Sequence, residues 1–498
     1  MGRVAAAALL LWVQVFGLTP PRGQSPELSF ETLPDALQLE RLAGVWLGLA
    51  DLNRDGLQDV LVGGTNHYSL NKEQLYVLLS NGDGSLTDAT RKYLPRKARA
   101  ATPLAVVADL NGDGAFDVAL FDAGNQELGQ HPDGGFFGEK PHLLLSRPGK
   151  QRLKYSKQLA SAVLDAKRRD PNLDQFEKEL GPELHLKAIT AADIDGDGDV
   201  DMFGVAEGGY QNPPTHFYVN RGGGRFDVDF SRARFDRGSV FPFEDDWRNS
   251  TSLLADLDGD DRPDLIEGQQ RKATAGRERQ TSRIIFNDGS GGFPGPGASP
   301  ESASEVLLPQ VPMAGGFTAI SDIAVGDIDG DGDPDLVLGH SRQGRPAGVF
   351  DVSRYIQVLV NLGGRRFRDD TNKRMGSQAL QTKVEHPEQG ENRNLVGRLE
   401  LVDLDADGDL DLFMGGSASV DRYAPLIYQN DGRGRFEAIA PEAITEGRTS
   451  FAENAFPIDL DGDGVLDFIH ADTLPGPDGD FGTADDRHQI ISTMVTIR

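Results

Sequence analysis

The residues best suited to chemistry are aspartates that recur in short patterns of fixed spacing. Between Asp327 and Asp335, carboxylates stand at the first, third, fifth and ninth places, and Gly332 stands at the sixth. Alternate acidic side chains in a tight loop converge on one point, and the glycine allows the sharp turn that brings the ninth residue back. Without a cation these carboxylates would repel one another strongly. Oxygen ligands at this density predict a flexible Ca²⁺ site rather than a strictly octahedral Mg²⁺ site.

The same pattern occurs seven times along the chain. The predicted metal ligands are Asp51, Asn53, Asp55 and Asp59; Asp109, Asn111, Asp113 and Asp117; Asp193, Asp195, Asp197 and Asp201; Asp256, Asp258, Asp260 and Asp264; Asp327, Asp329, Asp331 and Asp335; Asp403, Asp405, Asp407 and Asp411; and Asp459, Asp461, Asp463 and Asp467. In the fourth loop Asp261 replaces the glycine. Because Asp adopts the left-handed conformation only at some cost, we expect the Asp256 loop to be the weakest site. Solvated acidic turns, the alternative, do not account for the regular repetition.

Composition restricts the class of partner. The net charge is −28, and it comes mainly from these loops, so that seven Ca²⁺ ions would cancel half of it. An acidic chain repels the phosphates of nucleic acids, which argues against a nucleic-acid partner. The chain has no cysteine, which excludes disulfides, thiolate metal sites and thiol nucleophiles.

The first residues predict secretion. Arg3 precedes an apolar stretch from Val4 to Leu18 that is too short to span a bilayer. We therefore expect a signal peptide over residues 1–24, with cleavage near Gly23, and one domain over residues 25–498. No later segment is apolar enough to cross a membrane. These features predict a monomeric protein that is secreted to the extracellular space or the cell surface.

The sequence around each acidic loop predicts the elements that position it. Short apolar runs flank the loops and predict buried strands. A third apolar run and a glycine-rich hairpin follow, and the residues expected to begin a fourth strand are Leu86, Phe226, Phe293, Phe367 and Phe436. Four strands in each of seven repeats predict an all-β, seven-bladed β-propeller. The stretch from Leu28 to Leu33 is similar to the fourth strands, so we expect it to complete the last blade.

The repeats resemble the FG-GAP/VCBS family. Its pattern is an apolar run, Asp-x-Asp/Asn-x-Asp-Gly-x-x-Asp, a second apolar run, and then Asn-x-Gly-x-Gly-x-Phe; Asp193–Asp201 and Asn220–Phe226 carry it here. The family includes integrin α-subunit propellers, extracellular adhesion proteins and bacterial surface proteins. The resemblance implies a calcium-binding propeller with an extracellular binding or adhesion role. Lectins and some lyases share the fold, so the resemblance does not determine an activity.

The long connections indicate where a partner would bind. In an up-and-down blade the acidic loop and the glycine-rich hairpin share one face, and the remaining connections lie on the other. We call that second face the crown; its predicted insertions are 122–141, 154–187, 267–282, 294–320, 340–355, 370–397 and 472–488. Functional residues concentrate on long loops, so we expect the crown to bind a protein or glycan. The alternative is loops that vary without a partner.

One insertion is predicted to be helical. Leu159, Val163 and Leu164 lie on one face of a helix over residues 156–169, and a second helix is predicted from Asp170 to Leu180. This pair is expected either to lie over the crown as a lid or partner surface, or to cover an exposed blade edge. In the last insertion, four aspartates could hold an eighth ion or form an ordinary acidic turn: Asp478, Asp480, Asp485 and Asp486.

The alternative function is an extracellular polysaccharide-acting enzyme of lyase or hydrolase type on the same scaffold. The chain carries no His-Glu-x-x-His or Gly-x-Ser-x-Gly motif. His340 and His470 follow second strands and could line an axial pocket as an acid–base pair, or be ordinary strand-end residues. Four aromatic residues of the crown could stack on sugars or fill loop interiors: Tyr210, Trp247, Tyr355 and Tyr423.

Overall fold

The structure is a computed structural model of the chain. The structure describes residues 28–33, 37–39, 45–64, 74–98, 103–122, 125–130, 136–137, 140–169, 186–206, 216–229, 248–271, 282–293, 305–309, 311, 317–343, 353–382, 398–415, 427–439, 455–474 and 487–497. The predicted signal peptide, the second predicted helix and the Asp478–Asp486 cluster lie outside these residues. No helix among the described residues is long and apolar enough to cross a membrane.

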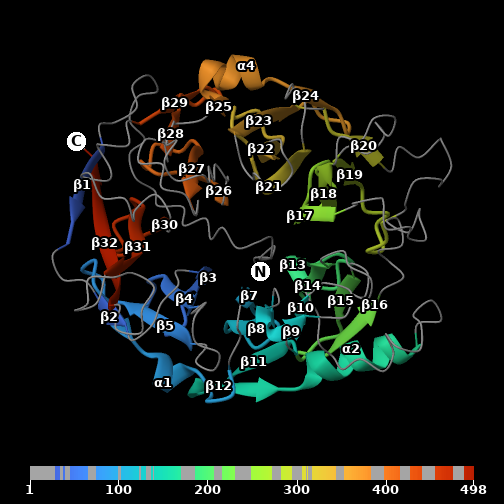
Figure 1. Cartoon of the computed structure of the whole chain (residues 1–498), viewed down its shortest axis with the longest axis vertical. Helices are drawn as coiled ribbons and strands as arrows, with labels where there is room; N and C mark the ends of the chain where they lie inside the picture. Colours follow the sequence, from blue (N-terminus) through green and yellow to red (C-terminus); the bar gives the residue numbers. More distant parts are fainter. Residues whose placement is uncertain are drawn as a thin grey trace.

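Seven antiparallel blades surround a central axis, as the sequence predicts, and the first strand of each blade lies nearest that axis (Figure 1). Blades one and two are β3 (Val45–Ala50), β4 (Asp59–Gly64), β5 (Gln74–Ser80) and β6 (Leu86–Asp88), and β7 (Pro103–Ala108), β8 (Asp117–Asp122), β11 (His142–Arg147) and β12 (Lys150–Ser156). Blades three and four are β13 (Leu186–Ala192), β14 (Asp201–Ala206), β15 (His216–Asn220) and β16 (Phe226–Asp229), and β17 (Arg248–Ala255), β18 (Asp264–Arg271), β19 (Arg283–Ile285) and β20 (Glu305–Leu307).

The remaining blades complete the ring. Blades five and six are β21 (Phe317–Gly326), β22 (Asp335–Gln343), β23 (Ser353–Asn361) and β24 (Phe367–Asp369), and β26 (Arg398–Val402), β27 (Asp411–Gly415), β28 (Ile427–Asn430) and β29 (Phe436–Ala438). Blade seven is β30 (Ala455–Ile458), β31 (Asp467–Leu474), β32 (Arg487–Ile497) and β1 (Leu28–Thr32). The other elements are β2 (Leu37–Leu39), β9 (Asn125–Gln130), β10 (Phe136–Phe137), β25 (Leu380–Thr382), α1 (Thr90–Tyr93), α2 (Gln158–Arg169), α4 (Thr371–Arg374) and the 3₁₀ turn η2 (Gly376–Gln378).

Strand β1 joins the beginning of the chain to its last blade. It pairs antiparallel with β32 from Leu28↔Ile497 to Thr32↔Thr493, and β2 continues along the same strand at Leu37↔Ile490. The last blade is therefore built from both ends of the described chain. This arrangement covers the outer edge of β32, which would otherwise present unpaired backbone groups.

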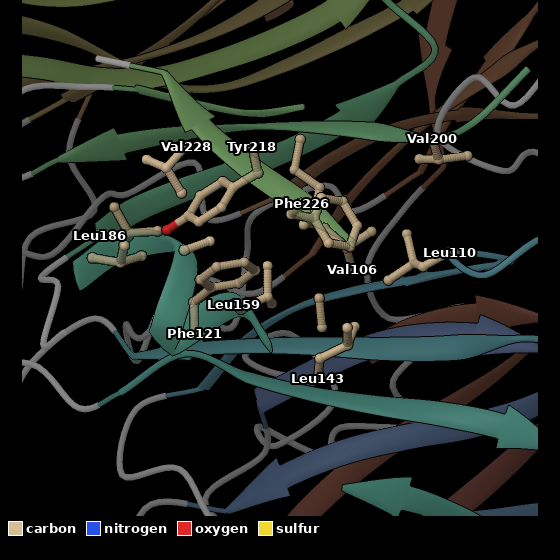
Figure 2. Close-up of a cluster of buried hydrophobic side chains, with 14 of the residues drawn as sticks. Val106, Leu110, Phe121, Leu143, Leu159, Leu186, Val200, Tyr218, Phe226 and Val228 are labelled. Atoms are coloured by element: carbon tan, nitrogen blue, oxygen red, sulfur yellow. The ribbon is translucent and has the colours of Figure 1, made fainter. Parts of the chain in front are cut away.

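The core is divided among the junctions between blades. In the described part of the chain, seven clusters of buried apolar side chains each draw residues from two neighbouring blades. One of them joins Val62 of blade one to Ile469 of blade seven. Figure 2 shows the cluster between blades two and three, where the rings of Phe121 and Tyr218 lie 5.2 Å apart between centroids. Because each blade buries its two faces against two neighbours, its central strands are apolar on both faces, as in β15, which is buried throughout.

Helix α2 confirms the helix predicted over residues 156–169. Its position distinguishes between the two expected places, a lid over the crown and a cover for a blade edge. Leu159 and Val163 are fully buried in the cluster between blades two and three, and Gln158 Nε2 donates to the carbonyl of Phe226 at 2.7 Å. Figure 1 places α2 at the rim beside β16, the outer strand of blade three. The expectation of a lid over the crown is therefore wrong for α2. The helix covers a blade edge because its apolar stripe completes the core there.

Four asparagines fasten neighbouring blades together. Each begins a glycine-rich hairpin, and its Nδ2 donates to a carbonyl in the acidic loop of the preceding blade: Asn220 to Leu110 (3.0 Å), Asn287 to Ile194 (2.9 Å), Asn361 to Leu257 (2.8 Å) and Asn430 to Ile328 (2.8 Å). In the other three blades this place is taken by Ser80, Ser146 and Val495. The hairpin asparagine of the sequence pattern thus ties four consecutive junctions by a side-chain amide.

Blades four and five depart from the regular pattern. Strands β18 and β21 pair across the blade boundary at Gln270↔Ala319 and Arg271↔Thr318, which merges the two blades into one nine-stranded sheet. The expectation that Phe293 begins a fourth strand is wrong, because the fourth strand of this blade is β20, from Glu305. Phe293 is instead buried and stacks on Phe217 of blade three at 5.2 Å between ring centroids.

Candidate metal centres

An acidic loop joins the first strand of each blade to the second. Each loop is given the number of the blade to which it belongs. The aspartate at the first place accepts hydrogen bonds from amides of its own loop; in loop five Gly330, Asp331 and Gly332 donate to Asp327 at 2.8, 3.2 and 2.9 Å. The equivalent acceptors in the other loops are Asp51, Asp109, Asp193, Asp256, Asp403 and Asp459. These bonds hold the loop in a compact turn around its carboxylates.

The aspartate at the ninth place connects the loop to the third strand. Asp335 Oδ2 accepts from Ile328 N at 3.2 Å, and its Oδ1 accepts from Asn361 N at 2.7 Å. All seven ninth-place aspartates are almost completely buried: Asp59, Asp117, Asp201, Asp264, Asp335, Asp411 and Asp467. Burial raises the pKa of Asp59 and Asp117 to about 6, and that of Asp201, Asp264, Asp335 and Asp467 to about 7. A nearby cation would offset this cost of burying a charge.

Two backbone places in each loop require the left-handed conformation. At the sixth place Asp261 has φ of 65°, where other loops have glycine, as expected from the sequence. Sequence reasoning missed the fourth place, where Arg54 (φ 65°) and Ala406 (φ 55°) share the conformation that glycine supplies in the other five loops. The signal was available, since glycine occupies this place in Gly112, Gly196, Gly259, Gly330 and Gly462.

Carboxylates at the alternate places come together as the spacing predicts. In five loops three aspartates each offer an oxygen, and these oxygens lie within 4.8 Å of one another: Asp193, Asp195 and Asp197; Asp256, Asp258 and Asp260; Asp327, Asp329 and Asp335; Asp403, Asp405 and Asp407; Asp459, Asp461 and Asp467. Oδ1 of Asp258, Asp329 and Asp405 is buried and has no hydrogen-bond partner among the described residues. Buried anionic oxygens without a donor fit a bound cation, and an all-oxygen donor set fits a hard divalent ion.

Loops one and two carry an asparagine at the third place, and its amide makes local hydrogen bonds. Asn53 Nδ2 donates to Asp55 Oδ2 at 2.8 Å, whereas Asn111 Nδ2 donates to Asp117 Oδ1 and to Ser146 Oγ, both at 3.0 Å. Both asparagines are among the predicted ligands. Because the other loops have aspartate at this place, loops one and two have one carboxylate fewer among their four predicted ligands. Affinity for a divalent cation depends on the number of charged ligands, so these loops offer the less charged sites.

The seventh place adds carboxylates that the sequence analysis did not include. Asp199, Asp333 and Asp409 occupy it in loops three, five and six, which therefore have five aspartates each. Oδ1 of Asp409 is buried and has no hydrogen-bond partner within the described ranges. Burial, together with Asp407 and Asp405, raises the pKa of Asp409 to about 7. Alternation of aspartate through the seventh place was visible in the sequence and could have identified these residues.

The candidate catalytic histidines are packed within their own blades. His340 in β22 is 7% exposed and its Nε2 lies 3.0 Å from Gln357 Oε1, while burial lowers its pKa to about 4. His470 in β31 is 1% exposed, and its neighbours in the sheet are Ala455 and Ile491. The two belong to different blades. Glu267, a buried carboxylate in the second strand of blade four, forms an ion pair with Arg283 at 2.6 Å.

The aromatic residues expected on the crown are mostly outside the described part of the chain. Tyr210, Trp247 and Tyr423 lie outside the described residues. Tyr355 is described, and its expected place on a crown loop is wrong. It lies in β23, 6% exposed, in the cluster between blades five and six. Strand β23 begins at Ser353, so Tyr355 belongs to the same strand as the apolar run that follows it, and its ring is buried.

The fold and the loops together define a seven-bladed β-propeller with an acidic loop between the first two strands of every blade. The family model of the FG-GAP-like repeat matches residues 51–120 and 403–470, and the FG-GAP repeat model matches residues 319–347. The protein is an FG-GAP repeat propeller, as its motifs indicated.

Comparison with solved structures gives distant likenesses. The biofilm matrix protein Bap1 of V. cholerae is 14% identical, with 95% of this chain and 91% of that chain covered and a TM-score of 0.33. The polysaccharide lyase Uly1 is 10% identical, with 95% of this chain and 99% of that chain covered and a TM-score of 0.43. No curated protein sequence matches the chain.

Proposed function

We propose that the protein is a secreted propeller, stabilised by calcium, that binds an extracellular protein or glycan. The observation that carries the calcium part is the set of buried oxygens on Asp258, Asp329 and Asp405 that have no partner among the residues described, each in a loop of clustered carboxylates. Calcium accepts six to eight oxygen ligands in flexible geometry, which suits such loops better than magnesium does. Millimolar extracellular calcium would fill sites of modest affinity, and the apolar stretch at residues 4–18 favours export.

The binding part rests on the form of blades four and five. The acidic loops lie at one end of the blades, so the far ends of the second strands point to the crown. There β21 and β22 remain paired as far as Phe317↔Gln343, and β23 pairs with β25 at Ser353↔Thr382. With the β18–β21 bridge, these strands form a continuous ladder across two blades. An ordered platform of this kind favours a partner surface over loops that vary freely.

The calcium part is tested by titrating chelator-treated protein with Ca²⁺ in a calorimeter and counting the ions bound. We expect up to seven ions per chain. The melting temperature should rise on adding Ca²⁺, because an ion that binds the folded loops better than the unfolded chain stabilises the fold by mass action. Mg²⁺ should restore it poorly. A melting curve that is identical with and without calcium would contradict the proposal.

The binding part is tested by screening the calcium-loaded protein against arrays of glycans and extracellular matrix proteins. A variant in which residues 344–352, between β22 and β23, are replaced by a short Asn-Gly turn should lose partner binding and keep its calcium-dependent melting. Asp331→Ala, at the opposite end of blade five, is the matched control and should keep partner binding. Release of unsaturated sugar products would favour the enzymatic alternative, and loss of binding in Asp331→Ala alone would place the partner on the loop face.

A further inference from the structure

Arg365 stands where other blades have glycine. It occupies the fifth place of the glycine-rich hairpin of blade five with φ of 62°. The same place has glycine in four other blades, with φ between 70° and 80°: Gly84, Gly224, Gly291 and Gly434. A side chain is disfavoured in this conformation, and arginine has no local hydrogen bond of the kind that helps Asn and Asp to adopt it. A compensating contact of the Arg365 side chain is therefore to be expected.

That contact crosses the boundary to blade four. The guanidinium of Arg365 donates from Nε (2.7 Å) and from a terminal nitrogen (2.6 Å) to Oδ2 of Asp258, the third-place residue of loop four. It also lies over the ring of Phe286, 4.3 Å from the centroid. The Asp258 side chain is only 9% exposed, and its other oxygen, Oδ1, is buried and accepts no hydrogen bond from the part of the chain that the structure describes. Arg365 thus holds one oxygen of a candidate ligand and leaves the other for the loop.

The next junction repeats this arrangement with an arginine from a different element. Arg374, in α4, is 5% exposed and donates to Oδ2 of Asp329, the third-place residue of loop five, at 2.5 Å. Its other terminal nitrogen donates to the carbonyl of Arg433 in blade six, so the side chain bridges blades five and six. Oδ1 of Asp329 is again buried, and no described residue donates a hydrogen bond to it. In both loops, therefore, an arginine binds Oδ2 of the third-place aspartate, although one arginine comes from a hairpin and the other from a helix.

We infer that Arg365 and Arg374 are positioning residues for the ions of loops four and five, and that they couple ion binding to closure of the junctions on either side of blade five. The inference rests on the proposed calcium binding. Each arginine fixes the rotamer of a third-place carboxylate so that its free oxygen joins the carboxylate cluster. Partners that orient a metal ligand in this way change metal affinity about 10–100-fold when they are removed. Loop six lacks this bridge, because the partner of Asp405 Oδ2 is Gln429 of the same blade, at 3.0 Å.

The test compares Arg365→Lys and Arg365→Gly with the wild type, using the number of ions retained in equilibrium dialysis over a range of free Ca²⁺. Lysine keeps the charge and loses the planar fork, whereas glycine restores the residue of the other blades. We expect loop four to bind Ca²⁺ at least about tenfold more weakly in both variants, so that one ion fewer is retained over that range. Arg366→Lys is the matched control, because among the described residues the side chain of Arg366 donates to carbonyls of its own hairpin, those of Gly363 and Leu362.

The second readout is hydrogen exchange at the hairpin amides of residues 361–367, with and without Ca²⁺. Calcium should slow this exchange in the wild type and in Arg366→Lys, and much less in Arg365→Lys. Arg374→Lys should reproduce the loss for loop five. Unchanged ion retention in both Arg365 variants, or tighter binding in Arg365→Gly, would overturn the inference while calcium binding stands. A wild type that retains no Ca²⁺ would overturn the proposed calcium binding itself.

Discussion

The ninth-place aspartate shows that one residue serves the fold and the candidate metal site together. Both oxygens of Asp335 accept backbone amides, one from loop five and one from β23, and the side chain is fully buried. The fifth-place residue of the same loop, Asp331, lies at the exposed tip and has no such link to a strand. Loss of charge at these two places should therefore have different consequences.

Asp335→Asn should destabilise the protein by about 1–3 kcal/mol whether or not calcium is present, because the new NH₂ group faces an amide donor and one buried hydrogen bond is lost. Asp331→Asn is the matched variant and should reduce only the stabilisation gained on adding calcium. Urea unfolding of both variants in calcium-free and calcium-containing buffer measures the difference. Equal losses in the two buffers for Asp331→Asn would be inconsistent with its role as a ligand.

The candidate site could be predicted where its information is local. Alternating aspartates and a glycine within nine residues fix which oxygens converge, so the loops could be located before any tertiary contact was known. The partners of those oxygens could not be predicted. Arg365 and Asp258 are 107 residues apart, and only the closed ring brings them together. Sequence alone shows Arg365 as an irregularity in a glycine-rich hairpin, without indicating what it contacts.

At the scale of elements, α2 is part of the core that joins blades two and three. Leu159→Ala should therefore cost about 2–5 kcal/mol, since it removes a fully buried side chain from a packed cluster. Ser161→Ala, on the exposed side of the same helix, is the control and should change stability by less than about 0.5 kcal/mol. Chemical unfolding of the two variants checks this. A Leu159→Ala variant as stable as the wild type would mean that α2 is a dispensable cover.

The strands were predictable because their apolar runs are short and bounded by acidic loops and glycine-rich hairpins. The single-turn helices α1 and α4 were not predicted, although both blades carry an Asp-x-Thr sequence after the fourth strand. Thr90 N donates to Asp88 and Thr371 N to Asp369, while each threonine hydroxyl accepts from the third strand, at Val77 and Val358. The prediction that Phe293 begins a strand was wrong because an aromatic residue after the hairpin packs into a junction between blades whether or not a strand begins there.

At the scale of the whole molecule, acidic loops are placed side by side around a ring. The four consecutive junctions from blade two to blade six are tied by asparagine amides that reach from one blade to the loop of the previous one. Disturbance of a loop is therefore transmitted to the neighbouring blade, not only to its own strands. The charge of the loops must accordingly act on the stability of the complete ring.

This charge gives a pH dependence whose direction depends on calcium. Without calcium, burial raises the pKa of Asp201, Asp264, Asp335 and Asp467 from an ordinary value of 3.8 to about 7. Between these values the folded protein binds more protons than the unfolded chain, so stability decreases as pH rises. Calcium requires ionised ligands and competes with those protons, so the stabilisation it provides should increase over the same interval.

Calcium-free protein, prepared with a chelating resin, should therefore melt at a higher temperature at about pH 5 than at about pH 7.5, and the decrease should end once these aspartates are ionised. With saturating calcium the decrease should disappear or reverse, so the two melting curves diverge as pH rises. Repeating the calcium-free series in high salt controls for general repulsion at a net charge of −28, which salt screens more than it affects buried carboxylates. Stability that stays constant or increases from pH 5 to 7.5 without calcium would show that the ninth-place aspartates are ionised in the folded protein even without an ion.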